Sequence, residues 1–194
     1  DREILSLEEI SEIFDLSEIN KAGAKFSWEK LNWINSQYIK NMESIKLSEI
    51  MRGYWDDNGW VPPSQEWAYK LAILLRDSIT LLKDAIDQSK PFFLIPTIQK
   101  EGQDFLENEN SKASLKLILN YLNEQSTIKL DKEKAKEIIN VISKTHNVKK
   151  GILMKSLRVA FFGALSGPDL IQSWELFSEI KTDRSRIERC IKSI

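Results

Sequence analysis

Helix-start signals followed by apolar residues at helical spacing recur along the whole chain. Ser6 with Glu9 forms a capping-box pattern, and Ser27, Ser64 and Asp131 each precede apolar residues three or four positions apart. That spacing returns to one face of a helix, whereas a half-buried strand alternates at every second residue. The sequence has no convincing alternating segment, hairpin dipeptide or internal repeat. It therefore predicts an all-α fold built as a helical bundle.

The longest apolar stripe follows Ser64 and is expected to lie on one helix face. Its members are Trp67, Leu71, Leu74, Leu75, Ser78 and Leu82. Gly167 and Pro168 predict a later helix with the proline at its first position, and Thr182 or Asp183 is expected to cap the last helix. The polar stretch GQDFLENENS, residues 102–111, is expected to separate a larger helical group from a smaller, more basic one.

The formal net charge of −1 conceals a difference between the two parts of the chain. Residues 141–194 contain ten Lys or Arg and five Asp or Glu, which gives +5 and leaves −6 on the first 140 residues. Because Lys and Arg replace the counterions of phosphate, this asymmetry permits a nucleic-acid contact near the C-terminal end. On charge alone, solvated helix faces with no ligand are the alternative.

Composition excludes several classes of site. The single cysteine, Cys190, rules out an internal disulfide and a cysteine-rich zinc site, and the single histidine, His146, rules out histidine metal clusters and most catalytic triads. Glycine-rich phosphate loops, dinucleotide turns, zinc-protease helices and nucleophile elbows are missing from the sequence.

No apolar run is long enough to cross a bilayer, the start is not a signal peptide, and the first residue is not Met. We expect a cytoplasmic fragment of a longer protein that binds a partner and does not catalyse a reaction alone.

Two segments resemble the glutamyl-tRNA synthetases, which are class I aminoacyl-tRNA synthetases. Residues 19–40, INKAGAKFSWEKLNWINSQYIK, resemble the pattern sGAxFDxxKLxWmNxqYI that follows the catalytic domain in that family, and glutaminyl-tRNA synthetases share a looser version. Ser27 stands where the family has Asp, and either residue can cap a helix. The matching positions are Gly23, Ala24, Phe26, Lys30, Leu31, Trp33, Asn35, Gln37, Tyr38 and Ile39.

The second segment, residues 149–170, reads KKGILMKSLRVAFFGALSGPDL and resembles the family pattern kGklmxpLRvalTGxxxGPeL. Ser156 replaces the usual Pro, and Phe162 replaces a small or hydroxyl residue. The resemblance covers most of the chain and is strongest in these two blocks. The matching positions are Gly151, Leu157, Arg158, Val159, Ala160, Gly163, Gly167, Pro168 and Leu170.

The resemblance implies the carboxy-terminal, anticodon-binding region of an enzyme that joins glutamate to tRNA. Residues 1–45 would be a stem-contact segment, and residues 46–108 and 109–194 would be two helical anticodon-binding subdomains. The HIGH-like and KMSKS-like signatures of the Rossmann-type catalytic domain are missing from the sequence. The implied partners are glutamate tRNA and the N-terminal catalytic domain. ATP and Mg are implied as cofactors of the full enzyme only. The chain is expected to be a monomer.

Arg158 is the first candidate tRNA-binding residue, because it matches a family Arg that contacts an anticodon base. A guanidinium group can bond a base edge and stack on its plane, and Lys155 lies three residues earlier on the same predicted helix face. Gly167, Pro168 and Leu170 match a turn that offers backbone groups and apolar surface to unstacked bases. The alternatives are an Arg in an ion pair and an ordinary helix start.

Lys30 and Trp33 match positions that the family uses near the tRNA stem, and Lys21, which flanks Gly23, is expected to touch phosphate. Such contacts position the tRNA without reading its sequence. Trp33 is expected to lie in the core rather than at a contact.

Ser78 falls where family members that charge only glutamate tRNA carry Arg. A serine there would leave the third anticodon base unread, so glutamine tRNA would also be accepted, at a lost discrimination of about 1–3 kcal/mol. The alternative is a small buried residue on the apolar stripe.

Two other functions compete with tRNA recognition. The first is a helical protein-interaction scaffold, related to the synthetases, that does not read tRNA. The second is an enzyme active by itself, which predicts ATP-dependent turnover. Salt-dependent tRNA binding separates the first from recognition, because phosphate contacts weaken steeply as salt rises.

Overall fold

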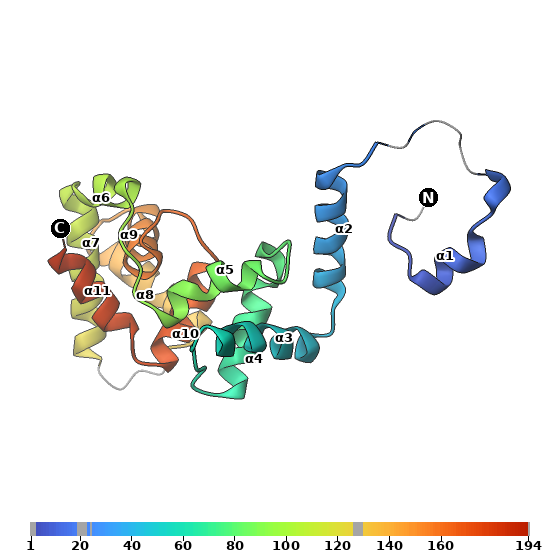
Figure 1. Ribbon diagram of the computed structural model, residues 1–194. Coiled ribbons are helices and arrows are strands. Elements are labelled where there is room, and N and C mark those ends of the chain that lie inside the picture. Colours follow the sequence, from blue (N-terminus) through green and yellow to red (C-terminus); the bar gives the residue numbers. More distant parts are fainter. Residues whose placement is uncertain (1–2, 19–22, 24, 126–129, 194) are drawn as a thin grey trace.

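The computed structural model describes residues 3–18, 23, 25–125 and 130–193, and these residues form helices with no strand (Figure 1). The all-α prediction is therefore confirmed. The elements are α1 (Leu7–Ile13), the 3₁₀ turn η1 (Leu16–Glu18), α2 (Trp28–Asn41), α3 (Ser44–Asp57), α4 (Gln65–Leu75), the 3₁₀ turn η2 (Arg76–Ser78), α5 (Asp84–Phe93), α6 (Lys100–Leu106), α7 (Glu109–Glu124), α8 (Lys132–Thr145), α9 (Lys150–Phe162), α10 (Leu170–Glu179) and α11 (Asp183–Lys192).

Side chains cap four helices where the sequence predicts them. Ser6 and Glu9 form the reciprocal capping box of α1, and Ser27, Ser64 and Asp131 accept backbone N–H groups at the starts of α2, α4 and α8. These bonds satisfy donors that the first helical turn leaves unpaired. At α11, Thr182 occupies the capping position, but its hydroxyl bonds the Phe177 carbonyl instead.

The apolar stripe after Ser64 is shorter than predicted. Helix α4 ends at Leu75, and the chain continues into η2 and a turn in which the Asp84 carboxylate accepts the backbone N–H groups of Thr80 and Leu81. These local bonds stabilise the turn in place of a continued helix. Ser78 is therefore exposed, and the prediction that places it on the apolar stripe is wrong.

The polar stretch 102–111 is mostly helical, since it forms the rest of α6 and the start of α7. The extended connection lies earlier, over residues 94–99 between α5 and α6. The division into residues 1–45, 46–108 and 109–194 stays a prediction.

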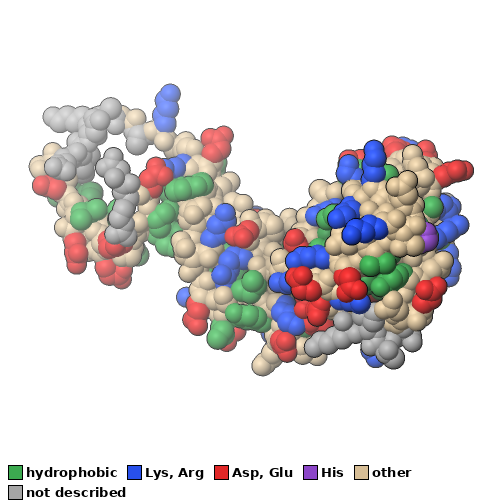
Figure 2. All heavy atoms as spheres, turned by 180° about the vertical axis from the view of Figure 1, so that it is seen from behind, with side chains coloured by type: hydrophobic (Ala, Val, Ile, Leu, Met, Phe, Trp, Pro, Cys, Tyr) green, Lys and Arg blue, Asp and Glu red, His purple; other side chains and the backbone are tan. Residues whose placement is uncertain are grey.

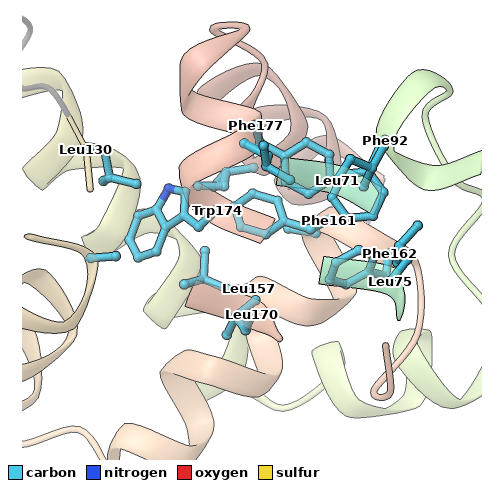
Figure 3. Close-up of a cluster of buried hydrophobic side chains, with 14 of the residues drawn as sticks. Leu71, Leu75, Phe92, Leu130, Leu157, Phe161, Phe162, Leu170, Trp174 and Phe177 are labelled. Atoms are coloured by element: carbon cyan, nitrogen blue, oxygen red, sulfur yellow. The ribbon is translucent and has the colours of Figure 1, made fainter. Parts of the chain in front are cut away.

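One apolar core runs through α3–α5 and α7–α11 (Figure 3). Phe92 of α5 stacks on Phe177 of α10, with ring centroids 5.0 Å apart and planes 13° apart. Phe161 of α9 approaches the same Phe177 ring at 4.9 Å. Trp67 of α4 donates its indole N–H to the Leu176 carbonyl oxygen at 3.0 Å. Both predicted helical subdomains thus contribute to a single core.

Two arginines of α11 bond carbonyl oxygens at the ends of other helices. Arg184 donates to the Leu122 oxygen of α7 at 2.7 Å. Arg186 donates to the Phe161 oxygen at 3.3 Å and to the Leu94 oxygen at 3.2 Å, and its guanidinium lies 4.3 Å from the centre of the Phe177 ring. A cation stabilises the negative end of a helix dipole, so α11 joins the ends of α7, α9 and α5.

Helix α1 lies apart from the main body, and α2 links the two (Figure 1). The Asn35 side-chain amide donates to the Thr80 oxygen, and the Tyr38 hydroxyl donates to the Leu5 oxygen at 2.6 Å. Trp33 is 40% exposed, which contradicts the prediction that it lies in the core, because α2 packs on the body only near its C-terminal end. Other large apolar side chains exposed in this region are Leu7, Ile10, Ile13, Phe14, Leu16, Phe26, Trp28 and Leu31.

We expect Trp67→Phe to lower the free energy of unfolding by about 1–3 kcal/mol, because it leaves the Leu176 carbonyl without its indole donor. Urea titration followed by circular dichroism measures the change. Trp28→Phe is the matched control: its ring is 71% exposed, and its effect should stay within about 0.5 kcal/mol. Equal effects of the two substitutions would contradict this account of the core.

Candidate nucleic-acid interface

Arg158 lies against the Gly167–Pro168 turn. Its Nη1 donates to the Gly167 oxygen at 3.0 Å and to the Pro168 oxygen at 2.9 Å. The structure therefore brings together three residues that the sequence predicts to act together. In the described ranges Arg158 has no ion pair, so the predicted alternative of an Arg in a salt bridge is not what this side chain does here.

The turn itself requires glycine. Gly167 has φ +150°, and a Cβ there would lie 3.1 Å from Cδ2 of Phe162. The expectation that Pro168 begins the next helix is wrong: Asp169 is the capping residue, and its carboxylate accepts the Gln172 N–H at 2.9 Å. The helix start is thus already occupied by a carboxylate, which leaves fewer N–H groups for a partner.

Leu170 is 1% exposed and packs in the core. In this conformation its side chain cannot offer apolar surface to a base. The exposed part of the turn is the backbone at Gly167, and the half-buried Arg158 side chain lies beside it.

The solvent face of α9 carries cations and no carboxylate. No Asp or Glu occurs between Glu137 and Asp169. Lys150 and Lys155 are exposed, and with Arg158 they fall within about 140° of helix circumference. Lys144 in the last turn of α8 is also exposed, as are His146 and Lys149 in the connection to α9. Figure 2 shows Lys and Arg side chains on this part of the molecule, with Asp and Glu side chains among them.

This cationic face is the feature that our sequence reasoning missed. Lys144, Lys149 and Lys150 were not among the predicted contacts. The signal was present, however, as 31 consecutive residues without a carboxylate, positions 138–168. On α9, Lys150, Lys155 and Arg158 form a stripe that leads toward Gly167, which is a surface suited to a polyanion, whereas Lys144 lies beside Glu133 and Glu137 of α8.

Two of the predicted stem-contact residues, Lys30 and Trp33, lie away from this stripe, on α2 (Figure 1). Lys30 lies over the Trp33 ring, with its Nζ 5.1 Å from the ring centre, and it also pairs with Glu3. The two residues share a helix face, as predicted. Lys21 lies outside the described residues.

Ser78 closes η2 with its hydroxyl donating to the Leu75 oxygen at 2.8 Å. Two residues earlier, Arg76 donates from Nη2 to Ser44 Oγ at 2.6 Å. Ser78 is open to solvent, so a partner can reach it.

The described residues offer little for independent catalysis. Among them, no group of three or more His, Cys, Asp or Glu is placed to hold a metal ion. Burial raises the pKa of Cys190 to about 11, so its thiol stays protonated at neutral pH and is a poor nucleophile. None of the helices in the described ranges has the length and apolar character needed to span a bilayer.

Comparison with known proteins gives one family match. Residues 35–191 match the sequence model of the anticodon binding domain. Glutamate–tRNA ligases of Prochlorococcus marinus are similar to this chain: that of strain MIT 9215 is 88% identical over the whole chain, and that of strain NATL2A is 46% identical over 97% of it. The chain spans 40% of the length of these curated relatives.

Solved structures agree with the sequence comparison. A glutamate–tRNA ligase crystal structure from Elizabethkingia meningosepticum superposes with a TM-score of 0.89 at 28% identity, covering 98% of this chain and 37% of that one. The corresponding synthetase from Elizabethkingia anophelis gives a TM-score of 0.80 at 29% identity, with the same coverage of both chains.

We expect Arg158→Met to loosen the Gly167–Pro168 turn, because it removes both hydrogen bonds that the guanidinium makes to the turn. Loss of about 1–1.5 kcal/mol per bond corresponds to faster amide exchange by about tenfold or more over residues 164–169. Hydrogen–deuterium exchange with mass spectrometry measures this rate. Lys155→Met is the control, since it removes a cation from the same helix face without touching the turn. Unchanged exchange in the Arg158 variant would show that the turn holds its shape without Arg158.

Proposed function

Because this chain belongs to the anticodon-binding domain family, we propose that it is the tRNA-recognising part of a glutamate–tRNA ligase, with no catalytic role of its own. The observation that carries the proposal is the contact of Arg158 with Gly167 and Pro168 at one end of the cationic face of α9. The glutamate–tRNA ligases that the chain resembles support glutamate tRNA as the partner.

Affinity and specificity have separate sources in this proposal. Lys150 and Lys155 attract the phosphate backbone, an interaction that positions the tRNA but carries no sequence information. Arg158 uses Nη1 to hold the turn, and its other N–H groups stay free to bond the edge of an unstacked base. A guanidinium already fixed by two carbonyl groups loses little conformational entropy when a base binds.

The apolar face of α1 and α2 fits a role as the surface that meets the rest of the ligase. Phe26 and Trp28 contact edge to face at 4.9 Å, and both are largely exposed. Exposed apolar patches of this kind mark interaction sites. In this proposal the N-terminal catalytic domain covers them and supplies the ATP and Mg chemistry, and Lys30 lies near the tRNA stem. A cytoplasmic monomer belongs to the same proposal.

The chain should bind glutamate tRNA, and replacing Arg158 with Ala should reduce its preference for the native anticodon. The loss of one base contact corresponds to about 1–3 kcal/mol, or about tenfold to a hundredfold in relative affinity. Lys150→Gln should instead weaken binding to every transcript and lower the slope of log affinity against log salt by about one. Filter binding of native and altered-anticodon transcripts at several salt concentrations measures both effects.

Lys100→Gln provides the matched control, because it removes an exposed cation of α6 that already pairs with Asp104. Its affinity and salt slope should equal those of the unaltered chain. Absence of salt-sensitive tRNA binding by a folded sample would favour the interaction-scaffold function instead.

Relaxed specificity at the third anticodon base is part of the proposal, with glutamine tRNA as a second substrate of the ligase. Ser78 is exposed and its short side chain bonds the protein's own backbone. Ser78→Arg should therefore raise the preference for glutamate over glutamine tRNA by about tenfold to a hundredfold. Competition binding of the two transcripts measures the ratio, and Ser78→Ala should leave it unchanged. A strong preference for glutamate tRNA in the unaltered chain would rule out relaxed specificity.

A further inference from the structure

The extended connection between α5 and α6 lies across the end of α9. The Gln99 N–H donates to the Gly163 oxygen at 2.8 Å. At the other end of the connection, Arg186 bonds the Leu94 oxygen together with the Phe161 oxygen near the end of α9. Residues 94–99 are thus fastened to α9 at two points.

Gly163 permits an unusually close backbone approach between the two segments. It has φ +70°, the left-handed conformation that ends α9. A Cβ at this position would lie 2.3 Å from the Thr97 oxygen and 3.0 Å from the Thr97 carbonyl carbon. A left-handed helix end alone favours glycine, but here any side chain would also collide with backbone that cannot rotate away.

This contact connects two candidate tRNA-reading points. The turn that contains Ser78 leads into α5, whose ten residues span about 15 Å and end at residues 94–99. On the other side, Gly163 leads within a few residues to the Gly167–Pro168 turn and Arg158. The spacing between the Ser78 turn and Arg158 is therefore bridged by α5 and by the contact of Thr97 with Gly163, beside the ring contact of Phe92 with Phe162.

We propose that the Thr97–Gly163 contact fixes the distance between the Ser78 turn and Arg158, so that one anticodon loop meets both, and that Gly163 is a positioning residue for tRNA discrimination. This inference rests on the proposed function. Loosening the contact leaves the lysines of the cationic face in place, so phosphate attraction is retained. It removes the preorganised spacing, and the base contact of Arg158 then requires ordering of the protein at the moment of binding.

Gly163→Ala and Gly59→Ala form a matched pair that tests the contact. Both glycines have φ +70°, so both substitutions introduce the same backbone strain, but a Cβ at Gly59 would meet no atom within 4 Å. Native and altered-anticodon transcripts are titrated against each variant at several salt concentrations. We expect Gly163→Ala to lose preference for the native anticodon by about tenfold or more with an unchanged salt slope, whereas Gly59→Ala retains its preference.

Cys190 reports independently on whether the contact has opened. It lines a cavity of about 220 Å³ together with Ile95, Pro96 and Thr97, and it is the chain's single cysteine. Displacement of residues 94–99 should therefore speed its reaction with a thiol reagent in Gly163→Ala and not in Gly59→Ala. This measurement requires no tRNA.

Gln99→Pro is a second variant for the case in which Gly163→Ala does not fold. Gln99 has φ −70°, which proline adopts without strain, and the substitution removes the N–H that bonds Gly163. Full anticodon preference in a folded variant whose Cys190 has become reactive would overturn the inference while leaving the proposed function intact. Lack of anticodon preference in the unaltered chain would overturn both.

Discussion

The stacked rings of Phe92 and Phe177 join helices that are far apart in sequence, and the arrangement of the C-terminal two thirds of the chain depends on them. The Arg186 guanidinium covers Phe177 and has no carboxylate partner in the described residues. Burial lowers the pKa of Arg186 to about 10, so the side chain still carries its charge at neutral pH. Carbonyl groups at helix ends and the ring face stabilise that charge. The core and the helix ends are therefore held by one group of contacts.

The candidate interface depends on the same region. Helix α9 buries Leu153, Leu157 and Phe161 in the core, which turns Lys155 and Arg158 toward solvent. The end of α9 then meets residues 94–99, and the next few residues form the turn that Arg158 holds. Specific recognition requires side chains and backbone groups that hold their positions before the ligand binds. Here the core holds Arg158 and its turn in place. Phosphate attraction needs only charge and exposure, which the lysines provide.

Local signals in the sequence predicted much of the fold. Caps such as Ser64 and Asp131 follow from bonds between neighbouring residues, and the helix period of α9 separates Arg158 from Leu157 without tertiary information. The errors arose where contacts outside the helical period decide. Ser78 follows the apolar period of α4, yet Asp84 stabilises a turn that exposes it. The close approach of Thr97 to Gly163 joins residues 66 positions apart, which no local pattern reveals.

The tryptophans differ in their exposure to water and therefore in their fluorescence emission. Trp55, Trp67 and Trp174 are buried in the body and Trp60 is half-buried against Phe93, whereas Trp28 and Trp33 on α2 are exposed to water. Buried indoles emit at shorter wavelengths than hydrated ones, so the fluorescence spectrum of the native chain should be the sum of a blue and a red component. Quenching by acrylamide would reach the red component first. A partner that covers α2 would therefore shift the emission wavelength of the α2 tryptophans, while the emission of the buried tryptophans would stay constant.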